Sequence, residues 1–135
     1  MINKFRIFLL FTFPMFFNFS CDGFVTFKGN VLNNDLPSSI ISDTSYASYS
    51  LKNPIQNAMV NFYVLNEKDS ILNNMLSNTL FTDSLGYFSI VNGVGCARYK
   101  GLLVATKKGF IPDSLYFEFE NSNEPIIFIV NLKKR

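Results

Sequence analysis

The sequence predicts an all-β protein, an antiparallel seven-stranded β-sandwich preceded by a signal peptide. Three observations carry this prediction. Apolar and polar residues alternate in several short segments after residue 20, as half-buried strands require. Glycine, asparagine and proline separate these segments at short intervals. The 115 residues of 21–135 suit one domain of ordinary size.

The first 20 residues have the pattern of a bacterial export signal. Lys4 and Arg6 precede an uncharged run of 13 residues, Ile7 to Phe19, and Cys21 follows shortly after it. The run is shorter than the ~20 residues that a membrane-spanning helix needs, and Pro14 would kink such a helix. We therefore assign residues 1–20 to a lipoprotein-type signal peptide rather than to a membrane span.

Cys21 has two predicted fates. It follows the small residue Ser20 at the end of the apolar run, which resembles a lipoprotein signal whose cysteine becomes the acylated first residue. Asn18 and Phe19 depart from the usual lipoprotein signal, which has leucine and then a small residue at these two positions. The alternative is a disulfide with Cys96 in an oxidising compartment. We predict lipidation, which would anchor the protein to the outer membrane of the cell envelope, on its periplasmic or surface face.

Charge and composition exclude several functions. After position 20 the chain has ten acidic and ten basic residues, so its net charge there is 10 − 10 = 0, and no basic stripe remains for nucleic acid. Histidine is absent, which removes the commonest general base and zinc ligand. Asp35 and Asp43 lack the spacing of a calcium-binding loop. We expect no catalytic residue, no metal, no cofactor and no enzymatic activity.

Period-two alternation marks three strands clearly. In VTFKGNV (25–31), valine and phenylalanine alternate with polar residues, and Gly29 falls in the inward row. AMVNFYVL (58–65) and LYFEFE (115–120) alternate in the same way, with both glutamates of the latter on the outward face. One face of each strand is therefore expected in the core.

The remaining strands are expected in three segments. TLFTDSLGYFSIV (79–91) predicts two short strands joined by a tight hairpin, because Asp83 can cap the turn and Gly86 can adopt positive φ. GLLVATKK (101–108) and PIIFIVNLKK (125–134) are rich in branched residues and are expected to be strands. The sequence does not determine which residues of these two strands point inward.

Two segments interrupt the strand pattern. NEKDSILNNML (66–76) has apolar residues at helical spacing after a cap at Asp69 or Ser70, so it predicts one or two helical turns. The segment 33–53 is rich in serine, asparagine and aspartate, and reads as a long exposed loop inserted in the domain.

Four short motifs follow one another along the chain: Gly-x-Val, PxxxAxV, TDxxGxF and a later Gly-Phe. Their order resembles the carboxypeptidase regulatory-like family of transthyretin-like (prealbumin-like) β-sandwiches, over about residues 24–132. The resemblance implies structural roles in strands and turns for its motif residues, which are Gly29, Val31, Pro54, Ala58, Val60, Thr82, Asp83, Gly86, Phe88, Gly109 and Phe110.

The chain departs from this family in two places. The family passes from its first strand to PxxxAxV through a much shorter connection than 33–53, and insertions on rigid scaffolds often carry binding specificity. Tyr46 and Tyr49 are therefore candidate contact residues, against the alternative of a tolerated polar loop. The related hydrolases that act on 5-hydroxyisourate rely on histidines and a C-terminal motif with tyrosine, whereas this chain lacks histidine and ends NLKKR.

These observations predict a non-catalytic lipoprotein of the cell envelope that acts as a binding or structural module. Its expected partners are the membrane, through the lipid, and an envelope protein complex or a glycan. Two alternatives stay open. A small hydrolase would bring Asp35, Asp43 and Asp83 into one pocket, and an oligosaccharide-binding module would line one concave strip with Tyr46, Tyr49, Tyr87 and Tyr116.

Overall fold

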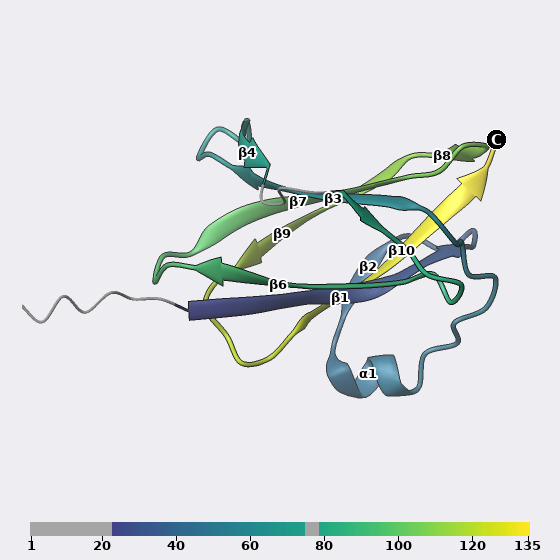
Figure 1. The fold of residues 1–135 in the computed structure, drawn as a ribbon, viewed down its shortest axis with the longest axis horizontal. Coiled ribbons are helices and arrows are strands. Elements are labelled where there is room, and N and C mark those ends of the chain that lie inside the picture. Colours follow the sequence, from purple (N-terminus) through teal and green to yellow (C-terminus); the bar gives the residue numbers. More distant parts are fainter. Residues whose placement is uncertain (1–22, 75–78) are drawn as a thin grey trace, which may run out of the picture.

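Two β-sheets packed face to face form a sandwich (Figure 1). The computed structural model describes residues 23–74 and 79–135. The predicted signal peptide and Cys21 lie outside the described residues. No helix among the described residues is long and apolar enough to cross a bilayer.

Sheet A has the strand order β2-β10-β1-β6, with β8 also paired to β10. The first and last long strands of the chain, β1 and β10, lie side by side and run parallel, so the prediction of a purely antiparallel sandwich is wrong at this pair. The pairing joins the two ends of the domain, which no local pattern encodes. The strands are β1 (Gly23–Asn33), β2 (Ser39–Ile41), β6 (Tyr87–Val94), β8 (Phe110–Ile111) and β10 (Ile126–Lys134).

Sheet B has the strand order β4-β3-β7-β9, with β5 also paired to β3, and all its pairs are antiparallel. The two sheets together have ten strands among the described residues, whereas the sequence predicts seven. The additional strands are only two to four residues long, which is too short for alternation to reveal them. The strands are β3 (Met59–Leu65), β4 (Ile71–Asn74), β5 (Leu80–Phe81), β7 (Tyr99–Thr106) and β9 (Asp113–Phe119).

Phenylalanine rings fill the space between the sheets. The rings of Phe27 and Phe62 stack across the sandwich with centroids 4.8 Å apart, and Phe117 meets Phe128 edge to face at 4.9 Å. Such arrangements are favourable for aromatic pairs. The predicted inward rows of β1, β3 and β9 are confirmed, and β7 and β10 complete the core with residues that include Leu103, Ala105, Phe128, Val130 and Leu132.

The segment 79–91 turns tightly, but it is not a hairpin. The N–H of Gly86 donates to Asp83 O at 3.0 Å, and the N–H of Asp83 donates to Tyr87 O at 3.1 Å. β5 pairs with β3 in sheet B, whereas β6 pairs with β1 in sheet A. The turn therefore carries the chain from one sheet to the other.

The segment predicted as a helical turn forms a strand instead. β4 pairs with β3, and the connecting turn is held by the Asn66 side chain, whose Oδ1 accepts the N–H groups of Lys68 and Ser70, each at 2.9 Å. Pairing with a neighbouring strand thus overrides the local helical spacing. The last two residues of the predicted helix, 75 and 76, lie outside the described residues.

The insertion 33–53 is not a free loop. It contains β2 and a short helix, α1 (Asp43–Ala47), which begins after Ser42, whose Oγ accepts the N–H of Ser45 at 3.1 Å. α1 lies on the side of sheet A that faces away from sheet B (Figure 1). Outside the core between the sheets, Leu32, Ile127 and Ile129 are fully buried, as expected if the insertion covers this face.

Candidate binding surface

The motif residues have structural roles. Thr82 is buried at 2% exposure, and its Oγ1 donates to Ile55 O at 2.6 Å and accepts the N–H of Ala58 at 2.9 Å. Pro54 makes an isolated β-bridge with Leu32. Motif residues Ala58, Val60 and Phe88 lie in the core, as the resemblance implied.

Asp83 and Gly86 shape the turn between the sheets. Asp83 Oδ1 accepts the N–H groups of Leu85 and Tyr87 at 2.8 and 2.9 Å. Gly86 has φ +70°, and a Cβ at this position would lie 2.4 Å from Val31 O. Gly109 also has positive φ, at +87°. Asp83, one of the three proposed hydrolase carboxylates, therefore serves the turn through backbone hydrogen bonds.

Tyr46 is a tether of the insertion rather than an exposed contact residue. Its hydroxyl donates to Asn30 Oδ1 on β1 at 2.7 Å, and Lys28 Nζ lies 5.6 Å from its ring centroid. Lys28 also pairs with Asp43 of α1 at 3.7 Å. Burial raises the pKa of the Tyr46 hydroxyl above its usual range, and the nearby Tyr87 and Asp83 raise it further. Tyr49 is half-buried, and Asp35 is exposed in the connection after β1.

The tyrosines do not line one strip. Tyr46 hydrogen-bonds to sheet A, and Tyr87 belongs to β6 of the same sheet. Tyr116 belongs to β9 of sheet B. The four-tyrosine arrangement that an oligosaccharide-binding strip would need is therefore wrong, since its members sit on different sheets.

The outward face of sheet B carries a different pair of tyrosines. Tyr63, Leu102 and Tyr116 are direct cross-strand neighbours on β3, β7 and β9. Tyr116 is 67% exposed. Adjacent strands lie about 4.8 Å apart, so the backbones of the two tyrosines are about 10 Å apart. We call this row, with Lys100 and Glu118 beside it, the tyrosine face.

Charged side chains border the tyrosine face. Lys100 Nζ pairs with Asp69 Oδ1 at 3.2 Å, and Arg98 Nε pairs with Glu118 Oε2 at 3.2 Å. All four side chains are between 46% and 72% exposed. Exposed pairs of this kind contribute little to stability, so a partner can displace them at small cost.

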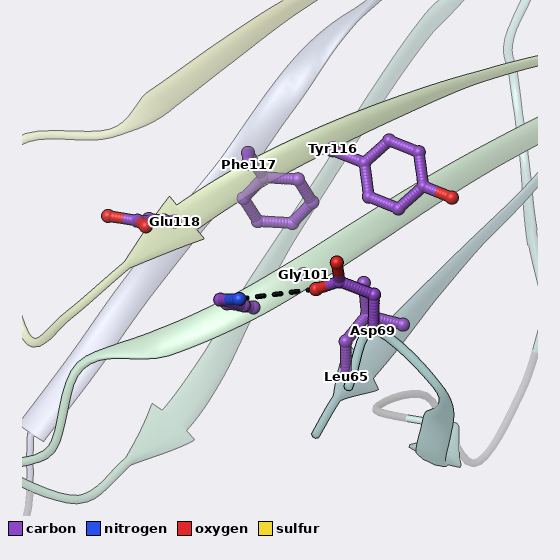
Figure 2. A pocket seen from close by; sticks show the side chains of 7 residues that line it. Leu65, Asp69, Gly101, Tyr116, Phe117 and Glu118 are labelled. Atoms are coloured by element: carbon purple, nitrogen blue, oxygen red, sulfur yellow. Dashed lines mark hydrogen bonds and ion pairs between the residues drawn. The ribbon is translucent and has the colours of Figure 1, made fainter. Parts of the chain in front are cut away.

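A hollow of about 280 Å³ lies at the end of this face where Lys100, Tyr116 and Glu118 meet Asp69, and Tyr63 and Leu102 are not part of its lining. Figure 2 shows Asp69 reaching from the turn after β3 toward β7, with Tyr116 and Glu118 on β9 nearby. The partner of Asp69 on β7 is Lys100, whose Nζ donates to Asp69 Oδ1. A Cβ on Gly101 would lie 2.4 Å from the Phe117 ring, so glycine lets that ring lie against β7. The lining offers aromatic surface, charge and hydrogen bonds, which is the chemistry of binding. It consists of Leu65, Asp69, Lys100, Gly101, Tyr116, Phe117 and Glu118.

Most of this surface cannot be predicted from the sequence. The alternation in LYFEFE indicates that Tyr116 and Glu118 point outward, but nothing in the sequence connects them with Tyr63 or Lys100. Their juxtaposition depends on the pairing of β7 with β9 and with β3, and β3 (Met59–Leu65) is distant in sequence from β7 (Tyr99–Thr106). The alternation in AMVNFYVL did place Tyr63 on the outward side of its strand, and this was the one signal available.

Cys96 is exposed in the segment between β6 and β7, and it is disulfide-bonded. The chain contains two cysteines. A disulfide within the chain and a lipid on Cys21 therefore exclude each other. The lipidation prediction itself falls on a residue outside the described ranges and stays a prediction.

No protein-family model matches the chain, and no curated protein matches it. Among solved structures it is similar to a mutant of Acinetobacter radioresistens catechol 1,2 dioxygenase (TM-score 0.53, 11% identity) and to 3-chlorocatechol 1,2-dioxygenase from Rhodococcus opacus 1CP (TM-score 0.50, 10% identity). The matches cover 84% and 87% of this chain but only 52% and 62% of those chains. At such low identity the similarity shows the two-sheet β-sandwich fold alone.

Proposed function

We propose that this protein is an exported, non-catalytic module of the cell envelope, which binds an envelope protein through the tyrosine face. The observation that carries the proposal is the exposed Tyr116 beside Leu102 and Tyr63, with charged pairs around them. Interfaces commonly place aromatic residues at the centre and polar residues at the rim. Because fold does not define function, the proposal rests on this surface and not on the similarity to dioxygenases.

Site-specific photocrosslinking tests the proposed contact. A photoreactive phenylalanine derivative replaces Tyr116 in the full chain, in cells that export it. A discrete crosslinked species of higher mass is expected. The matched control is the same replacement at Leu85, which is 66% exposed in the turn between the sheets and should give none.

A glycan partner is the second candidate. Tyr63 and Tyr116 lie on one face of sheet B, and tyrosine rings offer apolar surface with a polar hydroxyl. Crosslinking to a polysaccharide would give a broad smear in place of a discrete band. A smear would therefore favour an accessory role in polysaccharide binding over a protein contact.

The attachment to the outer membrane through Cys21 is part of the proposal. The export-like N-terminus supports it. The disulfide at Cys96 supports export to an oxidising compartment, but its partner within the chain could only be Cys21, which would leave no thiol there for a lipid. Intact mass of the protein purified from cells decides between the two fates of Cys21. A chain that begins at Cys21 with added acyl mass supports the anchor. An unacylated chain two protons lighter than its sequence mass rejects the anchor but leaves export intact.

We also propose that the chain is a divergent carboxypeptidase regulatory-like domain. The spacing of its motifs and the structural roles of Thr82, Gly86 and Phe88 support this. A family alignment built from homologues should then place glycine at position 86 and a small residue at position 58. Free variation at both positions would reject the membership.

A further inference from the structure

A hollow of about 290 Å³ lies at a gap in the pairing of β10. β2 pairs with residues 127–129 of β10, and β8 pairs with residues 133 and 134, so Asn131 lies between the two paired stretches. Leu36 and Pro37 approach the hollow from the insertion, and Ile111, Pro112 and Asp113 approach it from the connection between β8 and β9. Asn131 and Lys133 of β10 complete the wall.

The side chain of Asn131 has an unused acceptor in this wall. The residue is 3% exposed, yet its Oδ1 has no hydrogen-bond partner among the residues that the structure describes. Its Nδ2 donates to Pro37 O at 3.2 Å. Buried polar atoms nearly always find a partner. Pro37 and Pro112 have no N–H group to offer, so the donor for Asn131 Oδ1 has to come from elsewhere.

The same hydrogen-bond network fixes a second acceptor, the Asp113 carboxylate. The backbone N–H of Asn131 donates to Ser38 Oγ at 2.8 Å, and the Ser38 hydroxyl donates in turn to Asp113 Oδ2. Asp113 Oδ1 also accepts the N–H of Ser114 at 2.9 Å. The insertion, β9 and β10 are thereby locked together, so both acceptors are positioned before any ligand arrives.

The charges of the lining cancel. Asp113 contributes one negative charge and the Lys133 ammonium one positive charge, so the lining has no net charge that would select an anion or a cation. A hydroxyl group both donates and accepts, and several hydroxyls on one molecule can serve an amide oxygen, a carboxylate and an ammonium together. The two proline rings, Leu36 and Ile111 offer apolar surface for the C–H groups of such a ligand.

We propose that this hollow binds a neutral, hydroxyl-rich ligand, namely a single saccharide residue. Its hydroxyls donate to Asn131 Oδ1 and Asp113 and accept from Lys133. The volume lies at the lower limit of the roughly 300 Å³ at which ligand pockets begin, and it is about ten times the ~30 Å³ share of one water. The hollow is bounded by β10 of sheet A, apart from the tyrosine face, so this site is independent of the proposed protein contact.

Nuclear magnetic resonance on the isotopically labelled protein, purified from the cells that produce it, tests the site. The probes are glucose, galactose, mannose and N-acetylglucosamine, each titrated to tens of millimolar. At least one should shift the side-chain amide signals of Asn131 and the backbone signal of Lys133. Lys133→Met should weaken the binding of that sugar about tenfold, because a hydrogen bond to a charged group is lost. Lys134→Met, also at an exposed position but outside the lining, should not.

Three outcomes would overturn the proposal. No sugar shifts Asn131, which would leave bound water only in the hollow. Calcium or a zwitterionic amino acid shifts Asn131 while the sugars do not, which would refute a neutral ligand. Lys133→Met and Lys134→Met weaken the binding of the sugar equally, which would show that the sugar does not bind in this hollow. Because both lysines are exposed, neither variant threatens the fold.

Discussion

At the scale of single residues, both the backbone conformation and the packing require glycine at position 86. It has positive φ, and a Cβ would collide with Val31 O. We expect Gly86→Ala to lower the free energy of unfolding by about 2 kcal/mol, since both strain and steric overlap act. Gly93→Ala is the matched control, because a Cβ there would meet no atom within 4 Å. Urea unfolding measures both, and equal losses would contradict the role given to Gly86.

Tyr46 gives the protein a pH-dependent tether. The pKa of Tyr46 is raised in the folded state. Its contribution to the free energy of unfolding is therefore complete below the ordinary tyrosine pKa of about 10, and it is lost as the pH rises through the pKa of the folded state. We expect the free energy of unfolding to fall less between pH 8 and pH 11 in Tyr46→Phe than in the wild type. Tyr49→Phe, which leaves Tyr46 in place, should keep the wild-type difference. An unchanged difference in Tyr46→Phe would contradict the tether.

At the scale of elements, the insertion acts as a cover for the outer side of sheet A. Ile129 is fully buried there, whereas Ile40 of the neighbouring β2 lies opposite Phe128, on the other face of the sheet, and is 44% exposed. We expect Ile129→Ala to cost about 3 kcal/mol of stability, as for a buried isoleucine in a packed core. Ile40→Ala should cost well under half of that. If Ile129→Ala were nearly neutral in urea unfolding, the insertion would be a loose loop.

Individual strands could be predicted from the sequence because their signal is local. Alternation identified the inward rows of β1, β3 and β9. The unbroken apolar run in β10 is typical of a strand buried on both faces, and it was the available hint that something covers sheet A. The parallel β1–β10 pair and the strand character of residues 71–74 could not be predicted, because both depend on partners far along the chain or outside the local pattern.

The candidate surfaces depend still more on long-range pairing. The tyrosine face needs the register that places Tyr63, Leu102 and Tyr116 in one row. The hollow beside Asn131 needs the insertion to reach β10. Cross-strand alignment of this kind follows from tertiary structure, so sequence reasoning found single residues such as Tyr116 but not the sites they form.

At the scale of the whole molecule, sheet A and sheet B serve different purposes. Among the described residues, the insertion lies over one side of sheet A, whereas no further helix or strand lies over the outward side of sheet B, which carries the tyrosine face (Figure 1). A module held near a membrane can use such a free face for contact while its other side stays closed. The tyrosine face is therefore the surface on which the proposed function depends.

Photocrosslinking from position 116 of the exported full chain tests whether this face binds a partner. We predict a discrete species of higher mass from position 116 and none from position 85. The species should be lost when Lys100→Glu is combined with the photoreactive residue, because this change reverses the charge beside Asp69 and Glu118 without touching the core. No crosslink at position 116, or equal crosslinking from both positions, would contradict a binding role for this face.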